Sequence, residues 1–304
     1  MILLWQLKTF KKEKGALAGP EDMADQSNQD RKSTDGELNP HLKRWITAVI
    51  LAPFLIYIIG FAPRYIFYIA ITAISLLALN EFHQITSLQN HRFLYWTNAL
   101  LSILLLVCTY LRAIYFVPVI IVLWAFLPMS IAVICASSPC QEITYEIAAS
   151  VLALIYTSLP FSMLITIDRH SEGNIWILFL LCIVIASDTG AFYAGRFFGR
   201  HKLHKTVSPN KTWEGTIGGL VSSLIACLFC LTFFVPYRMH TTLLVLALAI
   251  SMAEQMGDLA ESLLKRNSGV KDSGNLLPGH GGILDRIDGF IFAIPVLYVF
   301  MFFA

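Results

Sequence analysis

Residues Ser262 to Phe290 read SLLKRNSGVKDSGNLLPGHGGILDRIDGF. This stretch joins two apolar runs, at about 241–263 and 284–304, each long enough to cross a bilayer. It nevertheless gathers acidic, basic and imidazole side chains, namely Lys265, Arg266, Lys271, Asp272, His280, Asp285, Arg286 and Asp288. Ionisable groups at a membrane are energetically expensive and mark functional sites. The stretch therefore predicts two neighbouring membrane helices with a polar functional site where they meet water.

The composition of the whole chain is that of a polytopic membrane protein. Of its 304 residues, 56% are hydrophobic and 14% are charged, whereas a soluble domain is about 25% charged. The six cysteines do not suggest a disulfide framework, and Cys227-x-x-Cys230 has no second Cys or His pair to complete a metal site. We expect the cysteines to be packing residues, because a free cysteine behaves as a small hydrophobe.

The apolar pattern predicts an all-α, polytopic integral membrane bundle of about nine transmembrane helices. The spans are expected at about 45–61, 65–80, 93–111, 114–135, 143–165, 174–197, 215–235, 241–263 and 284–304. Basic residues are densest in the loops after the sixth and eighth spans, and the positive-inside rule makes that side cytoplasmic. The N-terminus is then predicted inside and the C-terminus outside.

Three segments differ in their polar content. Residues 1–40 are polar and without periodicity, which predicts a cytoplasmic, disordered tail. Residues 41–165 hold few intramembrane polar groups and are expected to form a transmembrane scaffold. Glu81 and His83, near the end of the second span, are interpreted as interfacial rather than catalytic. Residues 166–304 are expected to form the catalytic transmembrane domain.

Two features of the sixth span and the loop after it point to function. Asp188 lies well inside an apolar run and is a candidate functional group, although a buried pairing that only holds the bundle is the alternative. The loop segment Ser208 to Gly215, SPNKTWEG, offers hydroxyls, a turn and Lys211 as donors suited to phosphate.

The eighth span carries a charged face. Glu254, Asp258, Glu261 and Lys265 stand at i, i+4, i+7 and i+11, which places them along one side of a helix. Gly257 leaves room beside Asp258 for a ligand or another backbone, and glycines 279, 281 and 282 precede a helix start that favours anions. Carboxylates beside lysines and arginines suit phosphate chemistry assisted by a divalent metal. The residues thus predict a cytoplasm-facing, metal-dependent enzyme acting on phosphate groups, without specifying a nucleotide base.

The opening stretch also resembles the signature of the phosphatidate cytidylyltransferases (CDP-diacylglycerol synthases). The resemblance is carried at fixed spacing by Ser262, Lys265-Arg266, Lys271-Asp272, Pro278, His280-Gly281-Gly282, Asp285-Arg286 and Asp288, and it extends over about 187–290. It implies a nucleotidyltransferase of phospholipid biosynthesis that converts CTP and phosphatidate into CDP-diacylglycerol and pyrophosphate.

The resemblance also implies roles for individual residues. Asp258 and Asp285 would be the metal ligands, with Glu261 and Asp188 as further candidates. Phosphate groups would be held by Lys211, Lys265, Arg266, Lys271 and Arg286, while His280 would orient a phosphate or protonate the leaving group. The remaining expected substrate-binding residues are Ser208, Thr212, Glu214, Ser262, Asp272, Gly281, Gly282 and Asp288.

The expected cofactor is Mg²⁺, and a second metal ion, K⁺ or divalent, is left open. The expected partners are CTP, phosphatidate and membrane lipid but no nucleic acid, and a homodimer is left open. The expected location is the bacterial inner membrane, with the active site facing the cytoplasm.

Three other functions remain as alternatives. The chain could be another CTP-dependent lipid enzyme, such as a polyprenol kinase or an ether-lipid CDP synthase. It could be an ion-coupled transporter, since intramembrane carboxylates also mark ion pathways. Against transport, the polar groups gather at one face and the two halves show no inverted repeat. An inactive regulatory relative is the third alternative.

Overall fold

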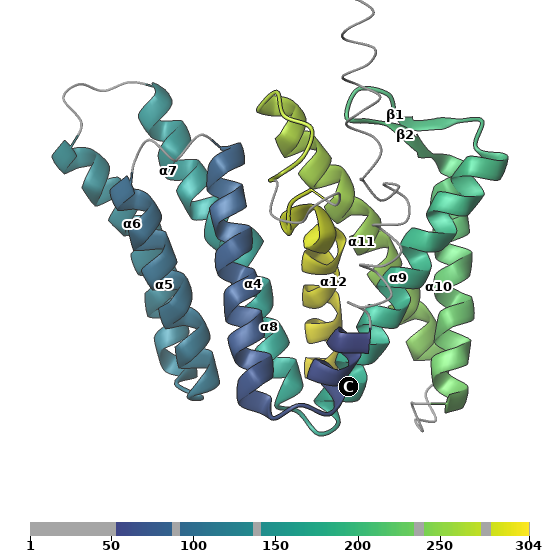
Figure 1. The fold of residues 1–304 in the computed structure, drawn as a ribbon. Coiled ribbons are helices and arrows are strands. Elements are labelled where there is room, and N and C mark those ends of the chain that lie inside the picture. Colours follow the sequence, from purple (N-terminus) through teal and green to yellow (C-terminus); the bar gives the residue numbers. More distant parts are fainter. Residues whose placement is uncertain (1–52, 87–91, 136–140, 234–239, 275–280, 304) are drawn as a thin grey trace, which may run out of the picture. The chain divides into compact units, whose positions relative to one another are not determined.

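The computed structural model describes residues 53–86, 92–135, 141–233, 240–274 and 281–303. Apart from one short hairpin, the regular elements within these ranges are helices (Figure 1). The helices are α4 (Arg64–Ile85), α5 (Arg92–Tyr110), η2 (Ile114–Phe116), α6 (Val117–Cys135), α7 (Gln141–Ala153), η3 (Leu154–Ser158), α8 (Leu159–Asp168), α9 (Gly173–Phe198), α10 (Trp213–Phe233), α11 (His240–Asn267) and α12 (Leu284–Phe303). Residues 53–60 are also helical.

Seven helical stretches are long and apolar enough to cross a membrane: 64–85, 93–110, 114–134, 143–168, 173–198, 213–233 and 241–267. They coincide with the second to eighth predicted spans, and α12 coincides with the ninth. Of the first predicted span, 45–61, residues 45–52 lie outside the described residues, and the predicted tail 1–40 lies wholly outside them. The all-α, polytopic bundle is therefore confirmed, while the orientation of the two ends stays a prediction.

The fifth span runs without a break through a π turn. η3 connects α7 to α8, and Pro160 lies at the start of α8. A proline has no N–H to donate to the preceding turn, which accounts for the locally altered hydrogen bonding. This irregularity leaves no mark in the apolar pattern of the sequence.

Buried polar side chains tie the helices of the first half together. The His83 ring is fully buried and its Nε2 lies 3.1 Å from Asn98 Nδ2. Asn98 Nδ2 also donates to Ser150 Oγ at 2.8 Å. The His83 ring thus packs inside the bundle against α5, and its interfacial position stays a prediction.

Helices α9 and α10 approach closely through small residues. A Cβ added at Gly218 would lie 2.2 Å from Ala194 Cβ, and one at Gly190 would lie 2.0 Å from Ser222 Oγ. Small side chains allow such helix contact within a membrane. The close packing places Asp188 of α9 and Thr216 of α10 along the same polar pocket, described below.

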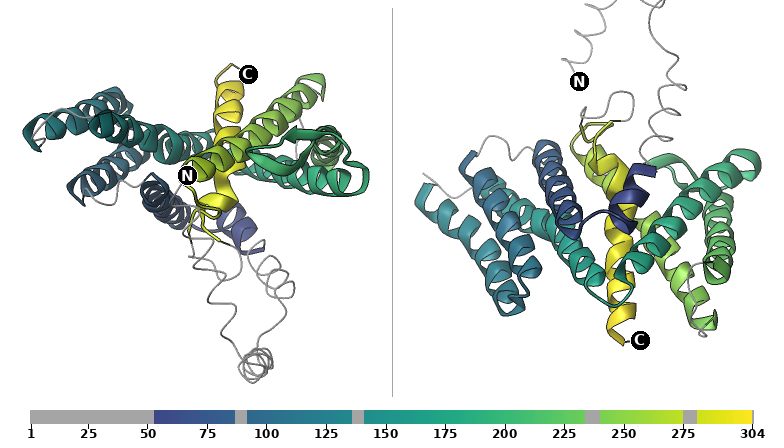
Figure 2. Two further views of the ribbon diagram at one scale, coloured as in Figure 1. Left: turned by 90° about the horizontal axis from the view of Figure 1, so that it is seen from above. Right: turned by 60° about the horizontal axis from the view of Figure 1, so that its bottom comes forward.

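Helices α11 and α12 pack together in antiparallel register (Figures 1 and 2). Lys265 contacts Asp285 near the loop that joins them. Deeper in the bundle, a Cβ on Gly257 would lie 2.6 Å from the carbonyl oxygen of Asp288. The space beside Gly257 is thus taken by another backbone, one of the two outcomes that the sequence left open.

A hairpin follows α9 where the sequence indicated only a loop. Strand β1 (Lys202–His204) pairs antiparallel with β2 (Ser208–Thr212), with Lys202 opposite Thr212 and His204 opposite Ser208. Arg266, at the end of α11, donates from Nε to the carbonyl oxygen of Val207 in the hairpin turn at 3.5 Å. The hairpin and the α11–α12 loop therefore lie at the same end of the helices (Figure 1).

Candidate active site

A polar pocket of about 510 Å³ lies among α9, β2, α10 and α11. Its ionisable lining residues are Asp188, Arg196, Lys211, Glu254 and Asp258. Ser208, Asn210, Thr212 and Gln255 add hydroxyl and amide groups. The structure thus brings together five residues that the sequence assigned to the site: Asp188, Ser208, Lys211, Thr212 and Asp258.

Lys211 and Asp258 form an ion pair across this pocket. Lys211 Nζ lies 2.6 Å from Asp258 Oδ2 and also donates to the carbonyl oxygen of Gln255 at 3.4 Å. The two side chains are 24% and 35% exposed, so the pair borders open space instead of being sealed in the bundle. Ser262 Oγ reaches Asp258 Oδ1 only at 3.5 Å. A phosphate entering the pocket would meet the ammonium group directly.

Glu254 is a buried residue in the lining of the pocket. Ser187 Oγ donates to Glu254 Oε2 at 2.6 Å and lies 2.7 Å from Ser251 Oγ, so hydroxyls on α9 and α11 hold the carboxyl group. Glu254 is buried, with 5% of its surface exposed. The sequence placed Glu254 on the charged face of α11 but did not assign it to the site.

Lys265 bridges two carboxylates at the joined ends of α11 and α12. Its Nζ lies 2.6 Å from Glu261 Oε2 and 2.6 Å from Asp285 Oδ1. All three side chains are largely buried: the exposed fraction is 11% for Lys265, 1% for Glu261 and 10% for Asp285. Glu261 Oε1 has no hydrogen-bond partner within the described part of the chain. The spacing on α11 predicted the Glu261–Lys265 proximity, and the tertiary fold adds Asp285.

Asp285 also closes the loop before α12. Its Oδ2 accepts hydrogen bonds from the backbone N–H groups of Ser273 and Gly282, each at 2.9 Å. Gly281 has a φ of +83°, and a Cβ there would lie 2.8 Å from Asp285 Oδ2. Glycine is the residue suited to that left-handed conformation. Gly281 and Gly282 thus serve the loop geometry around Asp285.

Sequence reasoning missed Glu81 of α4. Its carboxylate accepts hydrogen bonds from Ile283 N at 2.9 Å, Leu284 N at 2.7 Å and Ser273 Oγ at 2.9 Å. Glu81 is only 4% exposed, so its carboxylate faces this loop and not solvent. The sequence offered one signal, a lone acidic residue near the end of an apolar span. That pattern does not distinguish a carboxylate that faces solvent from one that binds a distant loop.

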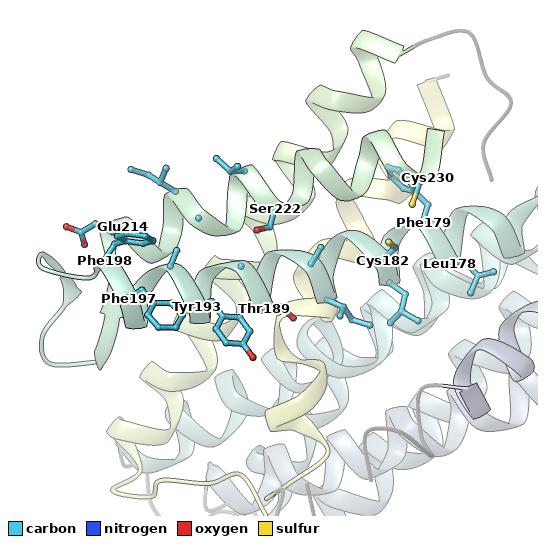
Figure 3. Close-up of a pocket in the computed structure, with 18 of the residues that line it drawn as sticks. Leu178, Phe179, Cys182, Thr189, Tyr193, Phe197, Phe198, Glu214, Ser222 and Cys230 are labelled. Atoms are coloured by element: carbon cyan, nitrogen blue, oxygen red, sulfur yellow. The ribbon is translucent and has the colours of Figure 1, made fainter. Parts of the chain in front are cut away.

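Other predicted residues lie outside this cluster. Glu214 turns to the hairpin, where its Oε1 lies 2.6 Å from His201 Nδ1. It lines an apolar groove of about 1050 Å³ along α9 and α10, shown in Figure 3 with Tyr193, Phe197 and Phe198. Four further predicted residues are exposed: Arg266, Lys271, Asp272 and Arg286. His280 and Pro278 lie outside the described residues, and Asp288 lies one turn along α12 from Asp285.

The carboxylates differ in how well they fit a metal ion. Among the residues that the structure describes, no group of three or more His, Cys, Asp or Glu side chains is arranged to hold one. Mg²⁺, however, takes one or two carboxylates and completes its shell with water and phosphate oxygens. Asp258 fits that requirement because it faces the pocket. Asp258 also pairs with Lys211, whereas Asp285 and Glu261 share the more deeply buried Lys265 and do not line this pocket.

Comparison with known proteins gives a family for this arrangement. The chain is 45% identical over 157 residues to proteins named phosphatidate cytidylyltransferase from Staphylococcus saprophyticus and from Staphylococcus aureus (strain COL). It is 44% identical over 157 residues to the protein of that name from Staphylococcus haemolyticus. Each alignment covers 51% of this chain and 59% of the relative, so the chain spans less than two thirds of the length of these relatives.

A wider match comes from the family itself. The sequence model of the cytidylyltransferase family matches residues 42–304, which include every helix and strand of the pocket. With that match, the chain belongs to the cytidylyltransferase family.

Proposed function

We propose that this protein transfers a cytidylyl group from CTP to phosphatidate, giving CDP-diacylglycerol and pyrophosphate. The observation that carries the proposal is the pocket where Lys211 pairs with Asp258 and which Asp188 and Glu254 also line, together with the Lys265 bridge further along α11. Its chemistry suits a triphosphate, and relatives that share 45% identity over 157 residues are named phosphatidate cytidylyltransferase.

In the proposed reaction, an oxygen of the lipid phosphate attacks the α-phosphorus of CTP. The bond from that phosphorus to the oxygen bridging the β-phosphorus breaks, and pyrophosphate leaves in line. The nucleophile is already ionised near neutral pH, because the second pKa of a phosphate monoester is about 6. The protein therefore has to position two anions and stabilise the charge that develops between them.

Lys211 and Lys265 are the cations placed for that task. In the structure each ammonium group is held by carboxylates, at 2.6 Å in every case. Phosphate oxygens entering the site would compete with these carboxylates for the same N–H donors. We propose that the carboxylates orient both lysines before substrate binds, and that phosphate oxygens then take over these N–H donors. Arg266, Lys271, Arg286 and His280 are the further proposed phosphate-binding residues.

We propose Asp258 as the principal ligand of Mg²⁺, with Asp285 and Glu261 as further ligands. The pocket exposure of Asp258 supports the first assignment. The other two carboxylates become available when Lys265 turns to substrate. When bound, the metal would neutralise charge on the triphosphate and the leaving pyrophosphate.

We also propose that residues 41–165 act as a scaffold and 166–304 carry the reaction, with the pocket facing the cytoplasm of a bacterial inner membrane. The support is the crowding of pocket, hairpin and α11–α12 loop at one end of the helices. The lipid substrate would then reach the site from the surrounding membrane. Assembly into a homodimer stays a proposal from the sequence.

The test is to supply the purified, full-length protein with labelled CTP, Mg²⁺ and phosphatidate. The proposal expects labelled CDP-lipid, whose formation requires both phosphatidate and Mg²⁺. Phosphorylation of a polyprenol with release of CDP would identify a polyprenol kinase. Transfer of the cytidylyl group to an archaeal ether lipid in preference to phosphatidate would identify an ether-lipid CDP synthase. Uptake of CTP or an ion into proteoliposomes without any chemistry would contradict the proposal.

A further inference from the structure

The carboxylate of Glu81 lies where the end of α4 meets the start of α12. It receives three hydrogen bonds from a segment 192 to 203 residues further along the chain. Oε1 accepts from Ile283 N at 2.9 Å, and Oε2 accepts from Leu284 N at 2.7 Å and Ser273 Oγ at 2.9 Å. Both oxygens are therefore used, and the three donors lie in the loop before α12 and at its first residue.

The position suits an anion for a general physical reason. Leu284 is the first residue of α12, and the first N–H groups of a helix have no partner within it. A negative charge at a helix start is further stabilised by the helix dipole. No Lys, Arg or His side chain in the described part of the chain forms an ion pair with Glu81. Within the described part of the chain, the N–H groups at the start of α12 therefore stabilise this buried carboxylate.

A second carboxylate holds the same segment from the opposite side. Asp285 Oδ2 accepts from Ser273 N and Gly282 N, and Asp285 N donates to Ser273 Oγ at 3.3 Å. Ser273 therefore contacts both carboxylates. The network links Glu81 to Asp285, and through Asp285 to Lys265.

The loop before α12 is tightly packed between the carboxylates of Glu81 and Asp285. A Cβ added to Gly282 would lie 2.0 Å from Ser273 Oγ and 2.4 Å from Glu81 Oε2. One added to Gly274 would lie 2.8 Å from Glu81 Oε1. The chain on both sides of the loop is therefore packed directly on the Glu81 carboxylate.

From this geometry we infer that Glu81 is a positioning residue for the active site. It fixes the start of α12 and the backbone donors around Asp285, and so sets the direction in which Asp285 holds Lys265. Its effect on catalysis rests on the proposed function, whereas its effect on the loop does not.

The test uses the full-length protein with Glu81→Gln. Glutamine keeps the size of the side chain but puts an NH₂ group where N–H or O–H donors point, so at least one hydrogen bond is lost whichever way the amide turns. Amide hydrogen exchange of a peptide covering 281–286 should become at least about tenfold faster than in the wild type, because this local structure opens more readily. Formation of CDP-lipid per folded molecule should fall by about tenfold or more.

His83→Asn is the matched control. His83 is buried on the same helix, two residues further on, and contacts Asn98 rather than the loop. Its substitution perturbs packing in the first half, so it should leave both exchange at 281–286 and turnover per folded molecule near the wild-type values. Equal losses of turnover and of exchange protection at 281–286 in both variants would overturn the inference, because Glu81 would then contribute only to packing in general.

Ser273→Ala adds a double-mutant cycle. Because Ser273 Oγ donates to Glu81 Oε2, its removal should slow turnover in the wild type and have a much smaller effect in Glu81→Gln. Unchanged exchange at 281–286 in Glu81→Gln, or faster exchange with full turnover, would overturn the inference. If the wild type makes no CDP-lipid but Glu81→Gln still accelerates exchange, the proposed function fails while the control of the loop by Glu81 stands.

Discussion

At the scale of single residues, Lys211 tests whether the pocket binds the nucleotide. Its ammonium group borders the pocket beside Asp258. Lys211→Met removes this cation while keeping a side chain of similar length, so the triphosphate loses a direct partner. The KM for CTP should rise by at least about tenfold, since a hydrogen bond between an ammonium group and a phosphate is stronger than one between neutral groups. Steady-state measurement of CDP-lipid formation against CTP concentration gives the value.

Lys202→Met is the control for this substitution. Lys202 lies on β1 of the same hairpin and is exposed. The same change of charge there should leave the KM for CTP within about twofold, because exposed charges interact weakly in water. Equal KM changes in the two variants would mean that the hairpin acts only through its general positive charge.

The residue scale also shows the limit of sequence reasoning. Helical spacing placed Asp258, Glu261 and Lys265 along α11, since a regular repeat fixes which side chains share a face. The same reasoning could not give Lys211 as the partner of Asp258, because that contact depends on where the hairpin folds. The role of Glu81 could not be predicted for the same reason, because its three hydrogen-bond donors lie 192 or more residues later in the chain.

At the scale of elements, the crossing of α11 and α12 depends on Gly257. A Cβ there would meet the Asp288 carbonyl oxygen at 2.6 Å and Gly289 Cα at 3.0 Å. Gly257→Ala should therefore push the helices apart and destabilise the protein by about 1–3 kcal/mol, the usual effect of overpacking. Thermal unfolding in detergent measures the change as a lower midpoint.

Gly60→Ala is the matched control, because among the described residues a Cβ at Gly60 would meet only Leu178 Cδ1, at 4.0 Å. Its unfolding midpoint should stay close to the wild-type value or rise slightly. An unchanged midpoint in Gly257→Ala as well would contradict the close crossing of the two helices.

Elements were predictable to the extent that their pattern is long and regular. The apolar runs predicted the spans now occupied by α4 to α12, because roughly 20 apolar residues are needed to cross a bilayer. The π turn at Leu154–Ser158 and the two short strands were not predicted. These elements depend on a few local hydrogen bonds, which leave no periodic trace in the sequence.

At the scale of the whole molecule, the topology can be tested independently of activity. In a background without native cysteines, single cysteines replacing Lys205 and Asp272 should be labelled from the cytoplasmic side of the membrane. Both positions are exposed, and both lie at the pocket end of the helices. A cysteine replacing the exposed Ser171, which follows the fifth span, should be labelled only from the opposite side. Labelling of positions 205 and 272 from different sides would contradict a single shared site.

The account depends most on Asp258 being part of a catalytic centre for cytidylyl transfer. Asp258→Asn keeps the shape of the side chain but removes the charge that faces Lys211 and the pocket. Asp168→Asn makes the same change at a buried aspartate, which pairs with Arg64 at 3.0 Å and lies outside the pocket. The decisive measurement is CDP-lipid formed per folded molecule from labelled CTP and phosphatidate, across a range of Mg²⁺ concentrations. We expect Asp258→Asn to fall by about a hundredfold or more at every Mg²⁺ concentration, and Asp168→Asn to stay near the wild type once its lower stability is allowed for. Turnover by Asp258→Asn close to that of Asp168→Asn would contradict the account.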